Sequence, residues 1–262
     1  MSRILLVGNK GSLFDKIYNR IKLDSNIHLF SINISRGDNL SFIYKKFWNA
    51  VNSFVFDKII YIGGETRDKS LMECFNYLLP VKMFNFAKAN RIRFIYLSSL
   101  SVYEKSYDLL KNQKIETLSA DTPYGSTKLK LEQEISRSKY LNYVGIRPAS
   151  LFSGKGRSSI ERVFFLSENN FVFKYFQFPG LITYLPVDDL VEEVYDSSVN
   201  YDIQGFVNLA RYVRVSDIQK GVSRRYRVPV FIPNICLTIL LKILPVRFAN
   251  ILKSLFGEVR YP

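Results

Sequence analysis

The sequence predicts an α/β fold in which helices cover both faces of a parallel sheet, a doubly wound arrangement, with a small C-terminal lobe. Two observations predict this fold. Short apolar runs typical of buried strands alternate with segments of helical periodicity through the first part of the chain. The first run, residues 3–7, leads straight into a glycine-containing loop and then a helical segment, which is how doubly wound folds begin.

The elements of the sheet follow one another in a regular order. Each expected strand is a short apolar run bounded by turn residues, and each expected helix places apolar residues on one face. The expected strands are residues 3–7, 27–34, 58–62, 94–97 and 143–147, and the expected helices are residues 13–21, 40–54, 74–89 and 124–136. We expect Asp38 to cap the second helix and Pro80 to kink the third.

The pattern loosens near residue 150. A loop rich in glycine and serine follows, then a stretch crowded with aromatic residues at 164–178 and a short helix at 190–197. We therefore expect a sheet domain at 1–150 and a smaller lobe at 151–262, some of whose elements return to the main sheet.

The composition excludes several classes of protein. Apolar residues make up 47% of the chain, so a folded core is expected. Two cysteines, Cys74 and Cys236, and one histidine, His28, provide neither a disulfide framework nor a metal site. The low cysteine content fits a reducing cytoplasm, and no apolar run has the length of a signal peptide or a membrane-spanning helix.

The formal net charge is +14, and much of it lies after residue 210. This bias suits an anionic partner, whether nucleotide phosphates, an acidic membrane surface or nucleic acid, and it equally suits a solvated basic face. The sequence lacks the ordered aromatic and basic residues of a nucleic-acid reader, so nucleic acid is not the expected partner.

The loop after the first strand has the features of a phosphate-binding turn. Gly8 and Gly11 let the backbone turn tightly, and Lys10 adds a positive charge. Ser12 and Leu13 begin the next helix, whose free N–H groups and positive dipole end favour a phosphate. We expect these five residues to bind the pyrophosphate of a dinucleotide.

The end of the second strand bears on which nicotinamide cofactor binds. A carboxylate at this point binds the ribose hydroxyl of NAD, but the sequence has Asn33 and Arg36, with Asp38 further on. Together with Lys10, they give a slight preference for NADP over NAD, because a cation suits the extra phosphate.

Tyr124 and Lys128 are four residues apart in an expected helix and therefore share one of its faces. A phenol has a pKa of about 10 and is a poor base at neutral pH, but a neighbouring ammonium stabilises the phenolate. Ser99 ends a parallel strand, at the edge where ligands bind in open α/β sheets. The three residues predict a Ser-Tyr-Lys site for hydride chemistry, in which Ser99 hydrogen-bonds the reacting oxygen.

The segments around these residues resemble the extended short-chain dehydrogenase/reductase family, in particular its NAD-dependent epimerase/dehydratase branch, which acts on nucleotide sugars. The matching segments are residues 96–103, 122–128, 145–149 and 185–190. The resemblance implies a Rossmann-type dinucleotide-binding domain at 1–150, a substrate-binding lobe at 151–262 and a homodimer.

The same resemblance assigns further residues. It implies that Gly63, Gly64 and Leu97 contact the cofactor together with Tyr124 and Lys128. It gives Asn76 a structural or catalytic role. Phe14 stands where the family usually has the third glycine of its loop, and the short segment before residue 58 indicates that one strand of the family is missing.

The positions after Ser99 bear on the reaction. Dehydratases of this family carry an acidic pair there, whereas this chain has Leu100 and Ser101, so dehydration is not expected. We prefer a 4-ketoreductase acting on a UDP- or dTDP-linked sugar, and a C4 epimerase would use the same residues. Ser99, Ser101, Arg157 and Arg211 are the expected substrate-binding residues, the arginines because a guanidinium suits a diphosphate.

Two alternatives remain open from the sequence. A non-catalytic protein that binds a dinucleotide, as a redox sensor or an interaction partner, is the rival hypothesis, and Phe14 favours it. The basic, apolar segment 230–256 fits a peripheral contact with the inner face of an anionic membrane, suited to surface polysaccharide biosynthesis. It equally fits packing on the lobe or on a second subunit.

Overall fold

The computed structural model describes residues 1–35, 37–103, 115, 118–153, 159–222, 227–230, 243 and 255–256. The chain divides into two units by its internal contacts. The first unit comprises residues 1–104, 113–148 and 188–209, and the second comprises residues 105–112, 149–187 and 210–262. Because these units are defined by contacts, the expected division into domains at residue 150 stays a prediction.

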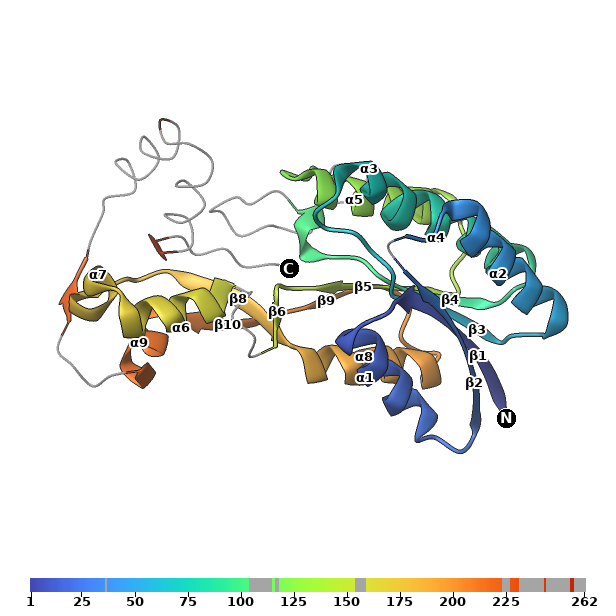
Figure 1. Cartoon of the computed structure of the whole chain (residues 1–262), viewed down its shortest axis with the longest axis horizontal. Coiled ribbons are helices and arrows are strands. Elements are labelled where there is room, and N and C mark those ends of the chain that lie inside the picture. The colour runs from blue at the N-terminus through green and yellow to red at the C-terminus, as the bar shows by residue number, and fades with distance from the viewer. Residues whose placement is uncertain are drawn as a thin grey trace. The chain divides into compact units, whose positions relative to one another are not determined.

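Within the described residues, the first unit contains a sheet of six parallel strands in the order β2-β1-β3-β4-β5-β9 (Figure 1). The strands are β1 (Ser2–Asn9), β2 (Ile27–Ile34), β3 (Lys58–Tyr61), β4 (Arg93–Leu97), β5 (Tyr143–Pro148) and β9 (Gly205–Leu209). Both faces of β3 and β4 are buried, as expected for a parallel sheet between two helix layers. Their carboxyl ends meet at one edge, and the predicted α/β fold is confirmed.

Helices cover both faces of this sheet. In Figure 1, α1 (Ser12–Lys22) and α8 (Val187–Val199) lie on one face, and α2 (Leu40–Ser53), α4 (Leu79–Ala89) and α5 (Pro123–Arg137) lie on the other. Two ion pairs join α1 to α8: Lys16 Nζ lies 2.5 Å from Asp188 Oδ1, and Arg20 Nε lies 2.8 Å from Glu192 Oε1.

The helix α2 begins at Leu40 as predicted, but its N-cap differs from the prediction. Its N-cap is Asn39, whose Oδ1 accepts a hydrogen bond from Phe42 N at 2.8 Å. The expected cap, Asp38, instead accepts a hydrogen bond from Ser35 N at 3.0 Å and so closes the preceding turn. Either side chain can cap a helix, and the turn after β2 decides between them.

The helical segment before β4 also differs from the prediction. It begins at Lys69 rather than at Cys74, as α3 (Lys69–Glu73), continues through a π-helical turn (Cys74–Leu78) and ends as α4. Pro80 lies in the first turn of α4, where a missing N–H is tolerated. The irregularity of this helical segment is therefore the π turn that precedes Pro80. A π turn of this kind accommodates one extra residue in a helix.

The second unit contains a small sheet and three helices among its described residues. The strands β6 (Leu151–Phe152), β8 (Leu181–Pro186) and β10 (Arg211–Arg214) form a sheet in the order β10-β8-β6, and β7 (Phe176–Gln177) pairs with β11 (Val228–Pro229). The helices are α6 (Ser159–Asn169), α7 (Phe171–Tyr175) and α9 (Val215–Val222). The buried Gln219 of α9 donates from Nε2 to Phe173 O and Phe176 O.

None of the helices in the described part of the chain is long and apolar enough to span a bilayer. The strand that follows α8, β9, pairs in parallel with β5 from Val144–Gly205 to Pro148–Leu209. An element after residue 151 thus completes the main sheet, beside the strand that ends at Pro148.

Candidate active site

The loop between β1 and α1 is shaped by its two glycines. A Cβ on Gly8 would lie 2.4 Å from Ile62 Cγ1, so the close approach of β1 to the end of β3 requires glycine there. Gly11 has a φ of +157°, which side chains rarely adopt, and open space lies where its Cβ would be. The N-terminus of α1 begins at Ser12 and, with Leu13, faces this loop with its free N–H groups.

Phe14 occupies a core position rather than the mouth of the loop. It shares the buried face of α1 with Ile17 and Ile21 and is only 4% exposed. Its ring edge lies 3.2 Å from the point where a Cβ on Gly8 would sit. The ring of Phe14 thus fills the space between Gly8 and α1. With glycine at position 14, α1 could pack closer to β1.

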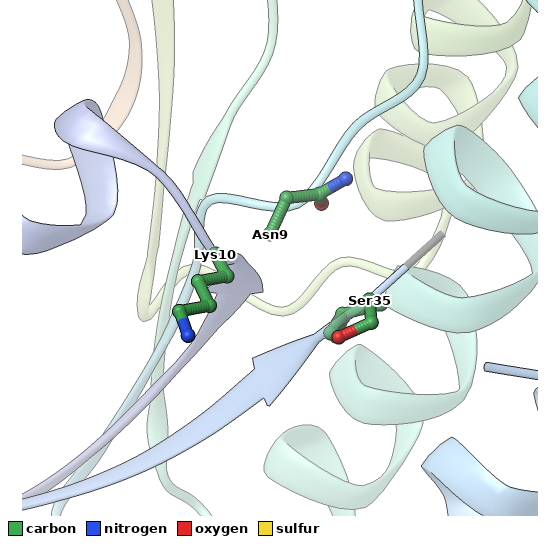
Figure 2. A pocket seen from close by; sticks show the side chains of 4 residues that line it. Asn9, Lys10 and Ser35 are labelled. Carbon is green, nitrogen blue, oxygen red and sulfur yellow. The ribbon is translucent and has the colours of Figure 1, made fainter. Parts of the chain in front are cut away.

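A cavity of about 430 Å³ opens beside this loop, lined by Asn9, Lys10, Ile34 and Ser35. Figure 2 shows Asn9 and Lys10 at the end of β1 and Ser35 just after β2. The cavity therefore lies at the carboxyl ends of two neighbouring strands, the usual ligand position in such sheets. Lys10 is exposed and brings a cation to it.

The predicted residues at the end of β2 are only partly described. Asn33 is exposed and pairs in register with Gly8, whereas Arg36 lies outside the described residues. The Asp38 carboxylate accepts from Ser35 N and lies 3.5 Å from Lys46 Nζ. The carboxylate of Asp38, the acidic residue that follows β2, is thus already engaged by the chain itself.

The loop after β3 is held by two asparagines in the same way. The Asn9 side chain accepts from Gly64 N at 3.1 Å and donates to Gly64 O at 3.2 Å. The Asn76 side chain accepts from Glu65 N at 2.9 Å and donates to Glu65 O at 2.8 Å. Each side-chain amide pairs with the N–H and C=O groups of one loop residue, as a neighbouring strand would do. These hydrogen bonds fix the conformation of the loop.

Asn76 lies in the π-helical turn and is fully buried. Its Nδ2 also donates to Thr127 Oγ1 at 3.0 Å, which ties the loop to α5. A Cβ on Gly64 would lie 3.2 Å from Asn76 Oδ1 and 3.5 Å from Lys128 Nζ. Glycine at position 64 thus lets both side chains approach the loop.

The structure brings Ser99, Tyr124 and Lys128 together at the carboxyl end of β4. The Tyr124 phenol is hydrogen-bonded to the Ser99 side chain. Ser99 Oγ also donates to Ser101 Oγ and accepts from Ser101 N, both at 3.1 Å. The Lys128 ammonium lies 5.9 Å from the centre of the Tyr124 ring.

Lys128 is held by backbone carbonyl groups. Its Nζ donates to Leu97 O at 2.7 Å and to Gly63 O at 3.5 Å. The side chain is only 2% exposed. It therefore joins the end of β4 to the loop after β3, and predicted site residues from three elements meet around one ammonium.

Burial shifts the pKa values of both titratable residues. Desolvation raises the pKa of Tyr124 to about 12, and the hydrogen bond from Ser99 opposes this shift. Desolvation lowers the pKa of Lys128 to about 8, and the negative charge of Glu132 opposes it. At neutral pH the site holds a neutral phenol beside an ammonium, so it is set to donate a proton.

The start of α5 fixes the position of Tyr124. Thr122 is the N-cap and accepts from Gly125 N at 3.0 Å, and Pro123 follows in the first turn. A Cβ on Gly125 would lie 2.0 Å from Ser101 O, so only glycine allows this helix to start so close to the serine loop.

A buried ion pair below these residues was not predicted from the sequence. The Glu132 carboxylate accepts hydrogen bonds from Arg147 Nε at 2.9 Å, from Arg147 Nη2 at 2.6 Å and from Ser98 Oγ. Asn9 was missed as well. The sequence feature that could have identified Glu132 is its position four residues after Lys128, on the same face of the helix.

The predicted substrate-binding residues are less well placed. Ser101 contacts Ser99 through its hydroxyl. Arg211 begins β10 in the second unit, where it is exposed, and Arg157 lies outside the described residues. Their roles stay predictions.

Comparison with known proteins supports the resemblance seen in the sequence. The model of the NAD dependent epimerase/dehydratase family matches residues 62–171. A search of curated proteins found no match to this sequence.

Solved structures match most of the chain. A UDP-N-acetylglucosamine 4-epimerase from Bacillus cereus is 20% identical, over 85% of this chain and 81% of that one, with a TM-score of 0.63. A dTDP-4-dehydrorhamnose reductase from Bacillus anthracis in complex with NADP is 13% identical, over 88% and 85%, with a TM-score of 0.64. WbmG from Bordetella bronchiseptica in complex with NAD is 13% identical, over 88% and 81%, with a TM-score of 0.64.

At these identities the solved structures establish a shared fold. The segment matched by the family model includes α5, the helix that carries Tyr124 and Lys128. The resemblance seen in the sequence is confirmed: residues 62–171 match the model of the NAD dependent epimerase/dehydratase family, and the solved structures share the fold.

Proposed function

We propose that the protein is an NAD(P)-dependent oxidoreductase of nucleotide sugars, and specifically a 4-ketoreductase acting on a UDP- or dTDP-linked sugar. The observation that carries the proposal is the convergence of Ser99, Tyr124 and Lys128 at the carboxyl end of β4. Solved structures with the same fold include a dTDP-sugar reductase and a UDP-sugar 4-epimerase, which supports the substrate class.

The residues at the sheet edge fit a nicotinamide dinucleotide. Gly11, where a Cβ would meet open space, leaves room for a pyrophosphate at the N-terminus of α1. Ser12 and Leu13 offer N–H groups there, and Gly8 lets β1 approach the end of β3. The volume of the cavity beside Lys10, about 430 Å³, falls within the range of small-molecule binding sites. On the other side, Gly63, Gly64 and Leu97 form the floor around Lys128.

The cofactor, when bound, supplies or accepts a hydride at the sugar carbon. We favour NADP over NAD because Lys10 lines the cavity, while Asp38, the acidic residue after β2, is turned to Ser35 N and Lys46. Asn33, exposed beside Gly8, would contact the ribose. The proposed contact of Arg36 with the extra phosphate of NADP rests on the sequence pattern alone.

The side chains of this site can complete a ketone reduction. Ser99 and Tyr124 donate hydrogen bonds to the carbonyl oxygen of the sugar, and Tyr124 transfers its proton to that oxygen as it becomes a hydroxyl. Lys128 stabilises the phenolate left on Tyr124. Since the pKa of Tyr124 is raised to about 12, its proton is present throughout the neutral range.

A C4 epimerase is the second candidate, because it would use the same three residues. In that reaction Tyr124 must first act as a base and remove a proton from the sugar hydroxyl. The raised pKa of Tyr124 favours the reductase, in which the phenol acts as the acid from the outset. Dehydration finds no support, since Leu100 is buried at 3% exposure and Ser101 is bonded to Ser99.

Two titrations test the proposal against a non-catalytic dinucleotide-binding protein. Binding of NADPH and NADH is followed by their fluorescence, and we expect binding well below millimolar concentrations. The protein is then incubated with UDP- and dTDP-4-keto sugars. Net oxidation of NADPH identifies the reductase, product without net cofactor turnover identifies the epimerase, and binding without product supports the sensor.

We also propose a cytoplasmic enzyme of surface polysaccharide synthesis that contacts the inner face of the membrane through the basic segment 230–256, most of which lies outside the described residues. The second unit holds 16 Lys and Arg residues against 5 Asp and Glu, a net charge of +11 out of +14 for the chain. Its helices α6 and α7 expose Phe165 (63%), Phe171 (70%) and Tyr175 (46%). Exposed aromatic rings on a strongly basic unit suit an anionic lipid surface. A homodimer remains an expectation from the family resemblance.

A further inference from the structure

Three consecutive residues at the end of β4 each contact one residue on a single face of α5. The carbonyl oxygen of Leu97 accepts from Lys128, Ser98 Oγ donates to Glu132, and the Ser99 side chain is hydrogen-bonded to Tyr124. The three α5 residues are spaced at four-residue intervals, so they lie in one row along the helix.

The contact between Ser98 and Glu132 is the one member of this set that the proposed chemistry does not use. Glu132 is fully buried, and a buried carboxylate persists only where charge and hydrogen bonds compensate it. Arg147 compensates it through two hydrogen bonds from its guanidinium. Arg147 is itself fixed, since its Nη1 donates to Tyr103 OH at 2.6 Å.

We propose that Glu132 is a positioning residue of this site: anchored by Arg147, its carboxylate holds Ser98 and thereby sets Ser99 opposite Tyr124, while its charge faces Lys128 along the same helix. This inference deepens the proposed function and rests on it for the meaning of the three residues. Ser98 cannot move relative to α5 without breaking the bond to Glu132, so the register of the strand end against the helix is fixed beside the reacting groups.

The charge of Glu132 has a second effect. Lys128 is surrounded by carbonyl oxygens and protein atoms, and burial lowers its pKa to about 8. Glu132 opposes this shift. Without it, a larger fraction of Lys128 would be neutral at physiological pH, and a neutral amine cannot stabilise a phenolate on Tyr124.

Other charged and titratable groups lie on α5 and on the elements next to it. They are Tyr124 and Glu132 on α5 itself, Tyr96 on β4, Tyr143 and Arg147 on β5, Tyr103 after β4 and Glu65 in the loop after β3. Burial raises the pKa values of Tyr96 and Tyr143, so these phenols are neutral near pH 8. These phenols therefore carry no charge that could replace the charge of Glu132.

The first test measures the titration of Lys128 directly. The protein carries ¹³C-labelled lysine, and the Cε resonance of Lys128 is assigned by its loss in Lys128→Met. We expect Glu132→Gln to lower the titration midpoint of Lys128 by about half a pH unit or more. Glu134→Gln, the same change on a half-buried residue of the same helix, is the control and leaves the midpoint unchanged. Equal midpoints in the wild type and Glu132→Gln would overturn the proposal.

Glu132→Gln leaves Arg147 without its partner, which can prevent folding. The double variant Glu132→Gln/Arg147→Gln removes both buried charges and serves as the second protein. It is expected to show the same lowered midpoint for Lys128. A midpoint like that of the wild type in a folded double variant would overturn the electrostatic part of the proposal.

Ser98→Ala tests the positioning part with a small change that keeps both charges. We expect kcat to fall about tenfold, with KM and the Lys128 titration unchanged. An unchanged kcat would show that Ser98 does not set the position of Ser99. The titration needs no substrate, so a wild-type protein without turnover would refute the proposed function and leave the Glu132 inference to be decided by the resonance of Lys128.

Discussion

Lys128 Nζ donates a hydrogen bond to the carbonyl oxygen of Leu97 at 2.7 Å, from a side chain that is only 2% exposed. Its contacts within the described residues are thus to neutral oxygens, and the ion pair next to it joins Glu132 to Arg147 instead. An ammonium held in this way is costly to bury. Lys128 is therefore expected to lower the free energy of unfolding, although it supports catalysis.

Lys128→Met should therefore raise stability while abolishing turnover. The folded-state pKa of Lys128 is lowered from 10.5 to about 8, so the cost of the buried charge is fully present below pH 8 and disappears as the pH rises towards 10.5. We expect the free energy of unfolding at pH 7 to increase by about 1–3 kcal/mol, with a smaller gain at pH 10. Urea unfolding at both pH values measures it. Lys130→Met, an exposed residue, is the control; a gain independent of pH would contradict the assigned pKa.

Tyr124→Phe removes the proposed proton donor and keeps the ring. We expect kcat to fall about a hundredfold or more while the affinity for NADPH stays within about twofold of the wild type. Stopped assays with a 4-keto sugar and fluorescence titration provide the two values. The control is Tyr18→Phe, a half-buried residue of α1. Wild-type rates in Tyr124→Phe would remove the tyrosine from the mechanism.

Gly125→Ala should destabilise the protein although alanine favours helices. The added Cβ would lie 2.0 Å from Ser101 O, so the helix start and the serine loop must separate. We expect the free energy of unfolding to fall by about 1–3 kcal/mol, and turnover to fall with it. Gly221→Ala in α9 is matched, because its Cβ meets open space; it should gain up to about 1 kcal/mol. A similar response of both variants would contradict the tight contact at Gly125.

Lys10→Ala tests cofactor preference. Lys10 lines the cavity beside Ser35, and a lost contact to the extra phosphate should weaken NADPH binding about tenfold, with a smaller effect on NADH. The affinities are measured by fluorescence at fixed ionic strength. Lys22→Ala, at the other end of α1, controls for the loss of one positive charge. Equal losses for both cofactors would end the preference for NADP.

The aromatic residues of α7 offer a test of membrane contact. We expect the wild type to sediment with vesicles containing about 30% anionic lipid and to dissociate at high salt, because charge attraction is screened. Phe171→Ser should bind more weakly, since its ring is 70% exposed. Phe42→Ser, an exposed residue of the first unit, is the matched control. Absence of binding by the wild type would leave the basic unit as a solvated surface.

Much of the sheet could be predicted from the sequence because buried strands leave a short, apolar signal. The strand at 27–34 was predicted to the residue. β9 was not, because Gly205–Leu209 is half-buried along its length and contains Gly205 and Asn208, which weaken the pattern. The start of α2 at Leu40 was predicted correctly, but its N-cap was wrong by one residue, since Asp38 and Asn39 can both cap a helix and only the turn after β2 separates their roles.

The candidate site shows the same division. Ser99, Tyr124 and Lys128 were predicted to converge because a helical spacing and a strand end carry them to one place. Asn9 and Glu132 were not, since each acts on a segment far away in the sequence: Asn9 on Gly64, and Glu132 on Ser98 and Arg147. Pairings of this kind depend on the sheet order, which local patterns do not encode.

The π-helical turn at Cys74–Leu78 makes the length of this segment a functional constraint. A deletion of one residue there would give a regular α-helix. The residues before and after the turn would keep their orientation, because the π turn accommodates one extra residue, but the residues of the turn itself would change position. Asn76 could then no longer reach both Glu65 and Thr127. Substitutions on the surface of this turn are therefore tolerable in evolution, whereas the loss of a single codon would release the loop on which Lys128 rests.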